Sequence, residues 1–148
     1  MKFLTPELVS LSENCHSAEE AIRKAGELLV KNGYVQEQYV ENMVESYRKH
    51  GAYIVITPRV AIPHALSSEY VITPSISLIQ LQKPVTFGHP TNDPVNLIFA
   101  LAGTSGEEHL RLIQKIVTLL NKPENINRLC NMQSYNELKK IVEGIEER

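Results

Sequence analysis

Cysteine, tryptophan and long apolar runs are scarce or missing in this 148-residue sequence, which has two cysteines and no tryptophan. Cys15 and Cys130 show neither a CxxC spacing nor a histidine at ligand spacing, so we expect reduced thiols. No apolar run approaches the ~18 residues of a membrane-spanning helix, and the amino terminus lacks a signal-peptide pattern. The expectation is a cytoplasmic protein without direct membrane insertion.

Charge of one sign is also lacking, because the net charge is only −2. Lysine and arginine do not gather in a cluster, so nothing indicates binding to nucleic acid or to an anionic membrane. Hydrophobic residues make up 43% and charged residues 22%, values that are typical of folded globular proteins. The length and the absence of repeats and linkers predict one domain over residues 1–148.

Helical periodicity marks both ends of the chain. Residues 17–33 begin with a capping box and end at a glycine, and residues 36–51 repeat the pattern of an apolar stripe stopped by glycine. A third helix is expected after Ser105, where Ser105 and Glu108 form a second capping box. A short helix is expected from Pro123, and a last one from Ser134, where Ser134 and Glu137 form a third capping box.

Strand patterns occupy the middle of the chain. YIVI (53–56) is predicted as a buried strand, and residues 75–82 and 84–88 as consecutive strands. NDPVNLIFALAG (92–103) is nearly all apolar, which is typical of a central strand covered on both faces. Together these elements predict an α/β fold, a single layered domain with a central mixed β-sheet flanked by helices.

Five histidines raise the question of a metal site. They form no HxxxH, HExxH or Cys/His pattern, so we expect no metal. A metal-dependent hydrolase is the alternative, and it predicts bound metal in the purified protein. His16, His50 and His89 are interpreted as surface or helix-cap residues.

His64 follows a proline in the stretch RVAIPHALSSEYV (59–71). Pro63 fixes its own φ and favours an extended Ile62, so the backbone that enters His64 is restrained. A neutral imidazole can attack through one nitrogen while a hydrogen bond holds the other. The residues alone leave open whether this Pro-His pair is a structural loop or a nucleophile.

His109 falls near the amino-terminal end of the helix that follows Ser105. Free backbone N–H groups at such an end favour an anion by about 0.3 to 2 kcal/mol. A charged hydrogen bond from a histidine adds about 1.5 to 3 kcal/mol. A share in holding a phosphoryl group and a simple place at its own helix edge are both consistent with this position.

Taken together, AIPHA (61–65) and His109 resemble the enzyme IIA components of the bacterial phosphoenolpyruvate-dependent sugar phosphotransferase system, in the mannitol/fructose-type superfamily. The resemblance covers nearly the whole chain and is closest to the ascorbate-type branch. It is carried, in the family's order, by the two leading helices, YIVITPRVAIPHA, NDPVNLIFALAG and EEHLRLIQKIVTLL. The implied fold is that of the mannitol-type IIA domain.

The resemblance implies a phosphotransferase without a cofactor. His64 would accept a phosphoryl group from the phosphocarrier protein HPr, as a tele-phosphohistidine, and pass it to a cysteine of a IIB component. His109 would support the phosphoryl group. Arg48 matches the arginine of the family's Arg-Glu pair but is followed here by Lys49. Through IIB the chain would serve a membrane IIC permease for ascorbate or a related sugar acid or polyol.

The loop around His64 carries two further expectations. Ser67 and Ser68 are either hydroxyl donors to the site or an ordinary polar turn. Val60, Ile62 and Leu66 are expected to be exposed, where they would suit docking by successive protein partners. A stand-alone regulatory module, which reports phosphorylation state by binding other proteins, remains the alternative function.

Overall fold

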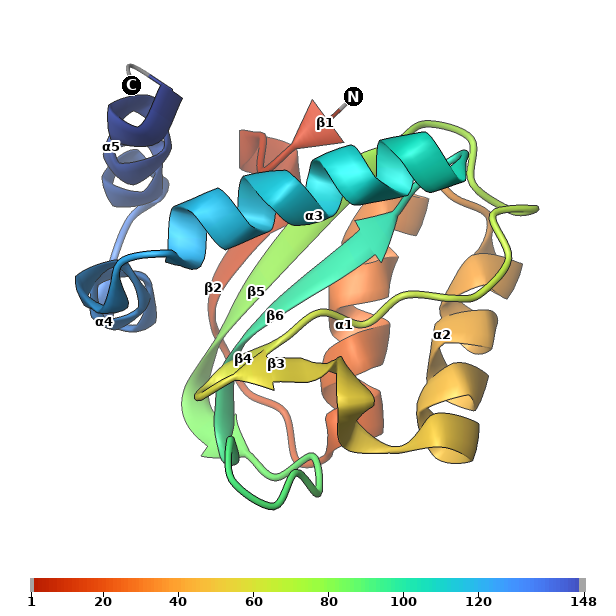
Figure 1. Cartoon of the computed structure of the whole chain (residues 1–148), viewed down its shortest axis with the longest axis horizontal. Coiled ribbons are helices and arrows are strands. Elements are labelled where there is room, and N and C mark those ends of the chain that lie inside the picture. The colour runs from red at the N-terminus through yellow and green to blue at the C-terminus, as the bar shows by residue number, and fades with distance from the viewer. Residues whose placement is uncertain (1, 147–148) are drawn as a thin grey trace.

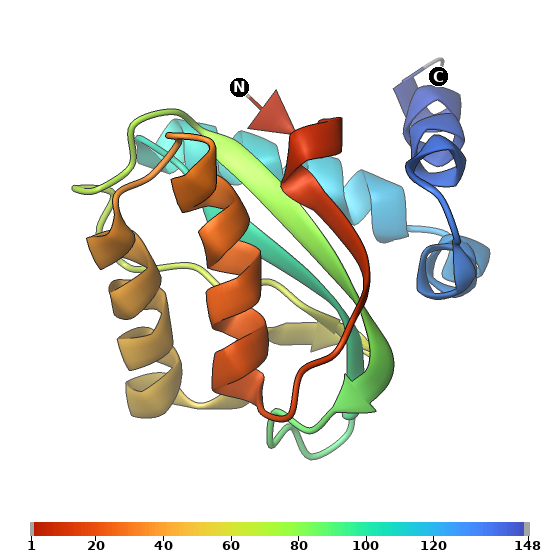
Figure 2. The same cartoon turned by 180° about the vertical axis from the view of Figure 1, so that it is seen from behind.

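The computed structural model describes residues 2–146, which form a six-stranded mixed sheet between two layers of helices (Figures 1 and 2). The strands are β1 (Lys2–Phe3), β2 (Val9–Glu13), β3 (Val55–Thr57), β4 (Val60–Ala61), β5 (Ser75–Val85) and β6 (Val95–Ala102). The α-helices are α1 (Ala18–Lys31), α2 (Glu37–His50), α3 (Gly106–Leu120), α4 (Pro123–Asn131) and α5 (Tyr135–Glu146). Single 3-10 turns cover Pro6–Leu8 and Ala52–Ile54. No helix in the described range is long and apolar enough to cross a membrane.

The sheet runs in the order β1-β5-β6-β4-β3, with β2 also pairing with β5. β5 and β6 are antiparallel, whereas β4 lies parallel to β6 and β1 and β2 lie parallel to β5. The predicted mixed sheet is therefore confirmed, and the predicted central strand, 92–103, contains β6.

Alternation along β6 divides the core between the two faces. Leu97, Phe99 and Leu101 pack with α3, α4 and α5, and the intervening residues pack with α1 and α2. All of these β6 side chains are fully buried. A strand covered on both faces gives a firm base for the residues at its carboxyl end.

The serine caps predicted for α1 and α3 are present. Ser17 Oγ accepts a hydrogen bond from the Glu20 N–H at 3.1 Å, and Ser105 Oγ accepts one from the Glu108 N–H at 3.2 Å. Each bond satisfies one of the free N–H groups of a helix start. The sequence therefore places the first turn of α3, which carries His109, to within a residue.

Two strand predictions were wrong. Residues 53–56 are not a buried strand, because Tyr53 lies in a 3-10 turn and the strand is the short edge element β3, where Ile56 is 47% exposed. Residues 75–88 are not two strands, because β5 continues through Pro84 to Val85. The pairing of β5 with β6 shifts register between Gln80 and Val85, and a proline is tolerated at such an irregularity.

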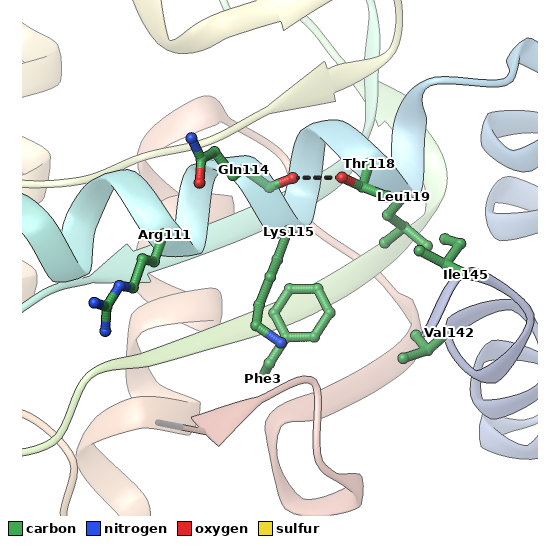
Figure 3. A pocket seen from close by; sticks show the side chains of 8 residues that line it. All are labelled: Phe3, Arg111, Gln114, Lys115, Thr118, Leu119, Val142 and Ile145. Atoms are coloured by element: carbon green, nitrogen blue, oxygen red, sulfur yellow. Dashed lines mark hydrogen bonds between the residues drawn. The ribbon is translucent and has the colours of Figure 1, made fainter. Parts of the chain in front are cut away.

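An apolar groove of about 330 Å³ lies between α3, α5 and β1 (Figure 3). It is lined by Phe3, Arg111, Gln114, Lys115, Thr118, Leu119, Val142 and Ile145. Its lining contains no histidine, cysteine or carboxylate. The groove is therefore separate from the histidines that sequence analysis selected.

Candidate functional site

His64 lies just beyond β4, at the carboxyl end of the central strand β6. The Ile62 N–H donates to the Ile54 carbonyl at 2.8 Å, and the Leu101 N–H donates to the Pro63 carbonyl at 3.0 Å. Pro63 itself is buried, while His64 is half-buried. The backbone that enters His64 is thus held on both sides, as the Pro-His pair predicts.

The ring of His64 has a defined tautomer. Its Nδ1 lies 2.9 Å from the carbonyl oxygen of Ile62. A carbonyl oxygen only accepts hydrogen bonds, so Nδ1 carries the proton and Nε2 has a free lone pair. Nε2 is therefore the atom on His64 that can attack an electrophile.

His109 meets His64 across the site. The two ring centroids are 5.2 Å apart with an interplanar angle of 67°. Burial, and secondarily the neighbouring His64, lower the pKa of His109 below its ordinary value, so its ring is neutral at pH 7. The first turn of α3 therefore brings a neutral imidazole to the nucleophile.

Gly103 makes this approach possible. A Cβ atom at this position would lie 2.9 Å from both the backbone N and the Cα of His109. Such a distance is too short for a real contact, so any side chain at Gly103 would displace the start of α3. No local pattern in the sequence marks this glycine, because its contact with His109 depends on how α3 folds back onto the end of β6.

Tyr53 and His50 extend the cluster on the other side of His64. The Tyr53 ring meets that of His64 edge-on, with centroids 5.7 Å apart, and meets that of His50 at 6.0 Å. The Tyr53 hydroxyl lies 3.2 Å from the hydroxyl of Ser46. His50 ends α2 as expected. The sequence pattern predicts a strand at Tyr53, so it gives no sign that this ring lies between two histidines.

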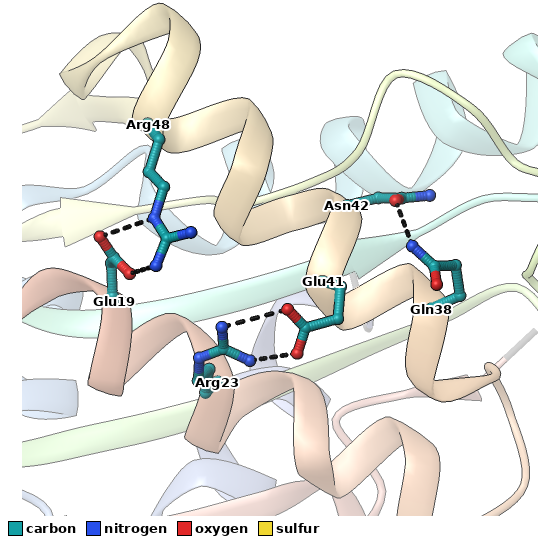
Figure 4. Close-up of polar contacts among 6 residues, drawn as sticks. All are labelled: Glu19, Arg23, Gln38, Glu41, Asn42 and Arg48. Atoms are coloured by element: carbon teal, nitrogen blue, oxygen red, sulfur yellow. Dashed lines mark hydrogen bonds and ion pairs between the residues drawn. The ribbon is translucent and has the colours of Figure 1, made fainter.

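Arg48 points elsewhere. Its guanidinium forms a two-pronged ion pair with Glu19 of α1 (Figure 4), with Nε donating to one carboxylate oxygen at 3.0 Å. Within residues 2–146, no hydrogen bond or ion pair joins Arg48 to either histidine. The pair with Glu19 raises the pKa of Arg48 and lowers that of Glu19. Arg48 links α1 to α2 in this structure, and a part in the site stays a prediction.

The expected docking residues divide into two groups. Val60 and Ile62 are buried, at 0% and 4% exposure, so the expectation that they face partners was wrong. Their side chains pack with Leu97 and the rest of the core beneath α3. Leu66 is 79% exposed and lies two residues beyond His64.

The two serines after Leu66 form a local turn. The Ser67 hydroxyl accepts a hydrogen bond from the Glu69 N–H at 3.2 Å, and the Ser68 carbonyl accepts one from the Val71 N–H.

The remaining histidines have structural surroundings. His89 Nδ1 accepts hydrogen bonds from the backbone N–H groups of Thr91 and Asn92, at 3.2 and 3.0 Å. The His16 N–H donates to the Glu20 carboxylate beside the α1 cap.

The two cysteines are free thiols. Burial raises the pKa of both Cys15 and Cys130. Over residues 2–146, no group of three or more His, Cys, Asp or Glu side chains is arranged to hold a metal ion.

Chemically, the site offers a positioned nucleophile beside a second imidazole. His64 Nε2 can form a bond to an electrophilic phosphorus or carbon atom, and His109 can donate a hydrogen bond to the group that becomes attached. Both histidines are only half-buried.

The chain matches one protein family along nearly its whole length. A family model described as "Phosphoenolpyruvate-dependent sugar phosphotransferase system, EIIA 2" matches residues 2–144. The ascorbate-specific EIIA component of Escherichia coli K12 is 29% identical over 136 residues, covering 91% of this chain and 88% of that protein. The mannitol-specific enzyme IIA component of Bacillus subtilis is 33% identical over 140 residues, covering 93% and 94%.

Solved structures give the same result for the fold. Enzyme IIA for mannitol from Escherichia coli, solved in complex with phosphorylated enzyme IIB, superimposes with a TM-score of 0.86 at 29% identity, covering 96% of this chain and 99% of that one. The crystal structure of IIA mannitol from the same organism gives a TM-score of 0.83 at 29% identity, covering 94% and 98%. The chain belongs to the EIIA 2 family of the sugar phosphotransferase system and is a phosphotransferase of the mannitol and ascorbate type.

Proposed function

We propose that this protein carries a phosphoryl group on Nε2 of His64, receiving it from phosphorylated HPr and passing it to a cysteine of a IIB component. The observation that carries the proposal is the contact of His64 Nδ1 with a backbone carbonyl. Nδ1 is committed to the Ile62 carbonyl at 2.9 Å, which leaves Nε2 as the reactive atom. The tele-phosphohistidine expected from the family resemblance uses this same nitrogen.

The reaction needs little from the protein beyond alignment. In the first step the P–N bond of the donor phosphohistidine breaks, the donor ring keeps the electron pair, and a new P–N bond forms at His64 Nε2. In the second step that bond breaks and a P–S bond forms on the IIB cysteine thiolate. Both steps exchange one energy-rich bond for another, so catalysis rests on positioning and on stabilising charge at the equatorial oxygens.

His109 is placed to stabilise the charge on the equatorial oxygens. Its ring centroid lies 5.2 Å from that of His64, within reach of a phosphoryl group on the neighbouring ring. A neutral imidazole costs less to desolvate than a charged one while the site is empty, and it gains a proton when an anion arrives. We assign it the stabilisation of the phosphoryl oxygens.

The partners follow from this relay. The Escherichia coli mannitol IIA structure was solved with phosphorylated IIB, and a IIB component of matching kind is the proposed acceptor here. From the IIB cysteine the phosphoryl group then passes to the carbohydrate that a membrane IIC permease carries. The proposed location is the cytoplasm, where HPr acts. Relatives of similar identity are specific for ascorbate and for mannitol, so we propose uptake of ascorbate or a related sugar acid or polyol.

Reconstitution tests the relay. Incubation with phosphoenolpyruvate and the two general phosphotransfer proteins is expected to add one phosphoryl group, labile to acid and stable to base. Addition of the IIB component is expected to discharge it. A protein that stays unlabelled overturns the carrier proposal. A protein that is labelled but never discharges to IIB favours the regulatory alternative, in which a deletion strain keeps sugar uptake and changes expression of other genes.

The ionisation of His109 provides a pH test. Its pKa is lowered in the unphosphorylated protein, by burial first and by His64 second. A phosphoryl anion on His64 opposes both effects and is expected to raise the pKa of His109 above its ordinary value. At a pH between these two pKa values, the His109 ring gains a proton when His64 is phosphorylated. A fall in pH within this range therefore favours the phosphorylated form. NMR titration of the His109 ring in both forms measures the change, and an unchanged pKa counts against the contact.

A further inference from the structure

We propose that Tyr39 is a positioning residue for phosphoryl transfer, because its hydroxyl ties the backbone directly after His64 to the central strand β6. The inference rests on the proposed function of His64. It concerns a residue that lies 25 positions before the histidine, on the buried face of α2.

The contacts of Tyr39 form a bridge. Its side chain is 2% exposed, and its hydroxyl donates to the Leu101 carbonyl at 2.5 Å. The same oxygen accepts a hydrogen bond from the Ala65 N–H at 3.3 Å. The Leu101 N–H in turn donates to the Pro63 carbonyl at 3.0 Å. The segment 63–65 is therefore bonded to Leu101 twice. The Leu101 N–H bonds it directly, and the Leu101 carbonyl bonds it through the Tyr39 hydroxyl.

His64 stands between the two tied residues. Its neighbours Pro63 and Ala65 are both held on Leu101, which is fully buried in the core under α3. Movement of the His64 backbone would have to break one of these hydrogen bonds. The position of Nε2 is thus fixed relative to β6, and through β6 relative to His109 at the start of α3.

The hydroxyl joins two backbone groups that are not bonded to each other directly. β4 pairs with β6 in parallel through Val60 and Ala61, and beyond this pair the Leu101 N–H still donates to the Pro63 carbonyl. The Leu101 carbonyl and the Ala65 N–H, however, are joined through the phenol. A tyrosine hydroxyl both donates and accepts, so it can join a carbonyl to an N–H across the gap, which an apolar side chain cannot do.

Acid–base chemistry is not the role of this phenol. Burial raises the pKa of Tyr39 to about 12, so its proton stays in place at neutral pH. The hydroxyl is also occupied by two backbone partners, away from the reacting nitrogen. Orientation of the segment 63–65 is what the contacts provide.

Tyr47 offers a matched control on the same helix. Its hydroxyl donates to the Phe87 carbonyl, and its ring packs edge-on against Phe87 at 5.7 Å. Phe87 belongs to the connection between β5 and β6, whose N–H groups are held by Asp93. Tyr47→Phe therefore removes the same atom from α2, also from a backbone carbonyl, without touching the segment 63–65.

The test compares Tyr39→Phe and Tyr47→Phe in the full chain. Single-turnover phosphorylation by phosphorylated HPr is followed over a range of donor concentrations, together with amide hydrogen exchange at Ala65. For Tyr39→Phe we expect the rate at saturating donor to fall about tenfold to a hundredfold, the cost of a misplaced reacting group. The half-saturating donor concentration is expected to stay unchanged, and Ala65 to exchange faster. Tyr47→Phe is expected to match the wild type in all three.

Results that contradict the role of Tyr39 differ from results that contradict the proposed function. A Tyr39→Phe protein that transfers at the wild-type rate, or a Tyr47→Phe protein that loses as much, overturns the positioning role. A wild-type protein that is never phosphorylated at His64 overturns the proposed function and this inference with it. Should Tyr39→Phe fail to fold, the wild type still decides, because an Ala65 amide that exchanges as fast as an exposed loop amide contradicts the bridge.

Discussion

A His64→Ala variant is expected to remain folded and to take up no phosphoryl group at all. The imidazole is half-buried, and its loss removes one hydrogen bond to the Ile62 carbonyl, worth about 1 kcal/mol of stability. The nucleophile itself has no substitute, because His109 presents a ring whose backbone is fixed in α3 and cannot take the place of His64. Intact-protein mass after incubation with phosphoenolpyruvate and the general phosphotransfer proteins measures the result.

His16→Ala is the control for this variant. Its backbone N–H contacts Glu20, and the residue lies at the exposed start of α1, far along the chain from the site. This variant is expected to be labelled as fully as the wild type. Full labelling of His64→Ala would show that another residue accepts the phosphoryl group.

A His109→Ala variant is expected to give the second largest effect. The variant should fold, since alanine favours the helix, and His64 should still become phosphorylated. Transfer onward to IIB is expected to slow by about a hundredfold, the usual result of removing one donor that stabilises charge in a transition state. Rapid-quench measurement of discharge to IIB gives the rate.

His109→Gln separates hydrogen bonding from charge in the same assay. Glutamine can donate a hydrogen bond but cannot take up a proton. A rate between those of the wild type and His109→Ala indicates that both contributions act. Equal discharge rates for the wild type and His109→Ala would show that the contact between the two rings, 5.2 Å apart, has no catalytic consequence.

Local sequence signals predicted the helices and the central strand well. Capping boxes at Ser17 and Ser105 mark helix starts through contacts three residues apart, so they are visible without a fold. The strand β6 is long and apolar, which distinguishes it from its neighbours. The two-residue strand β4, by contrast, exists because Val60 and Ala61 pair with Leu97 and Ile98, and no pattern in two residues can indicate that.

The same limit applied to the site. His64 was selected by its proline and by family resemblance, and His109 by its place on a helix. Tyr39 and Gly103 gave no local signal, because the Tyr39 hydroxyl meets a carbonyl 62 residues away and Gly103 matters through the backbone of His109. Arg48 was expected at the site from the family resemblance alone, and the structure pairs it with Glu19. Contacts between distant residues decide these cases.

The phosphoryl group is expected on one particular nitrogen of the His64 ring. Because Nδ1 donates to the Ile62 carbonyl at 2.9 Å, we predict attachment at Nε2. Nitrogen-15 NMR of the phosphorylated protein, labelled in its histidines, distinguishes the two ring nitrogens by their coupling to phosphorus. Phosphorus coupled to Nε2 of His64 is the predicted result. Phosphorus on Nδ1, or on any residue other than His64, would contradict it.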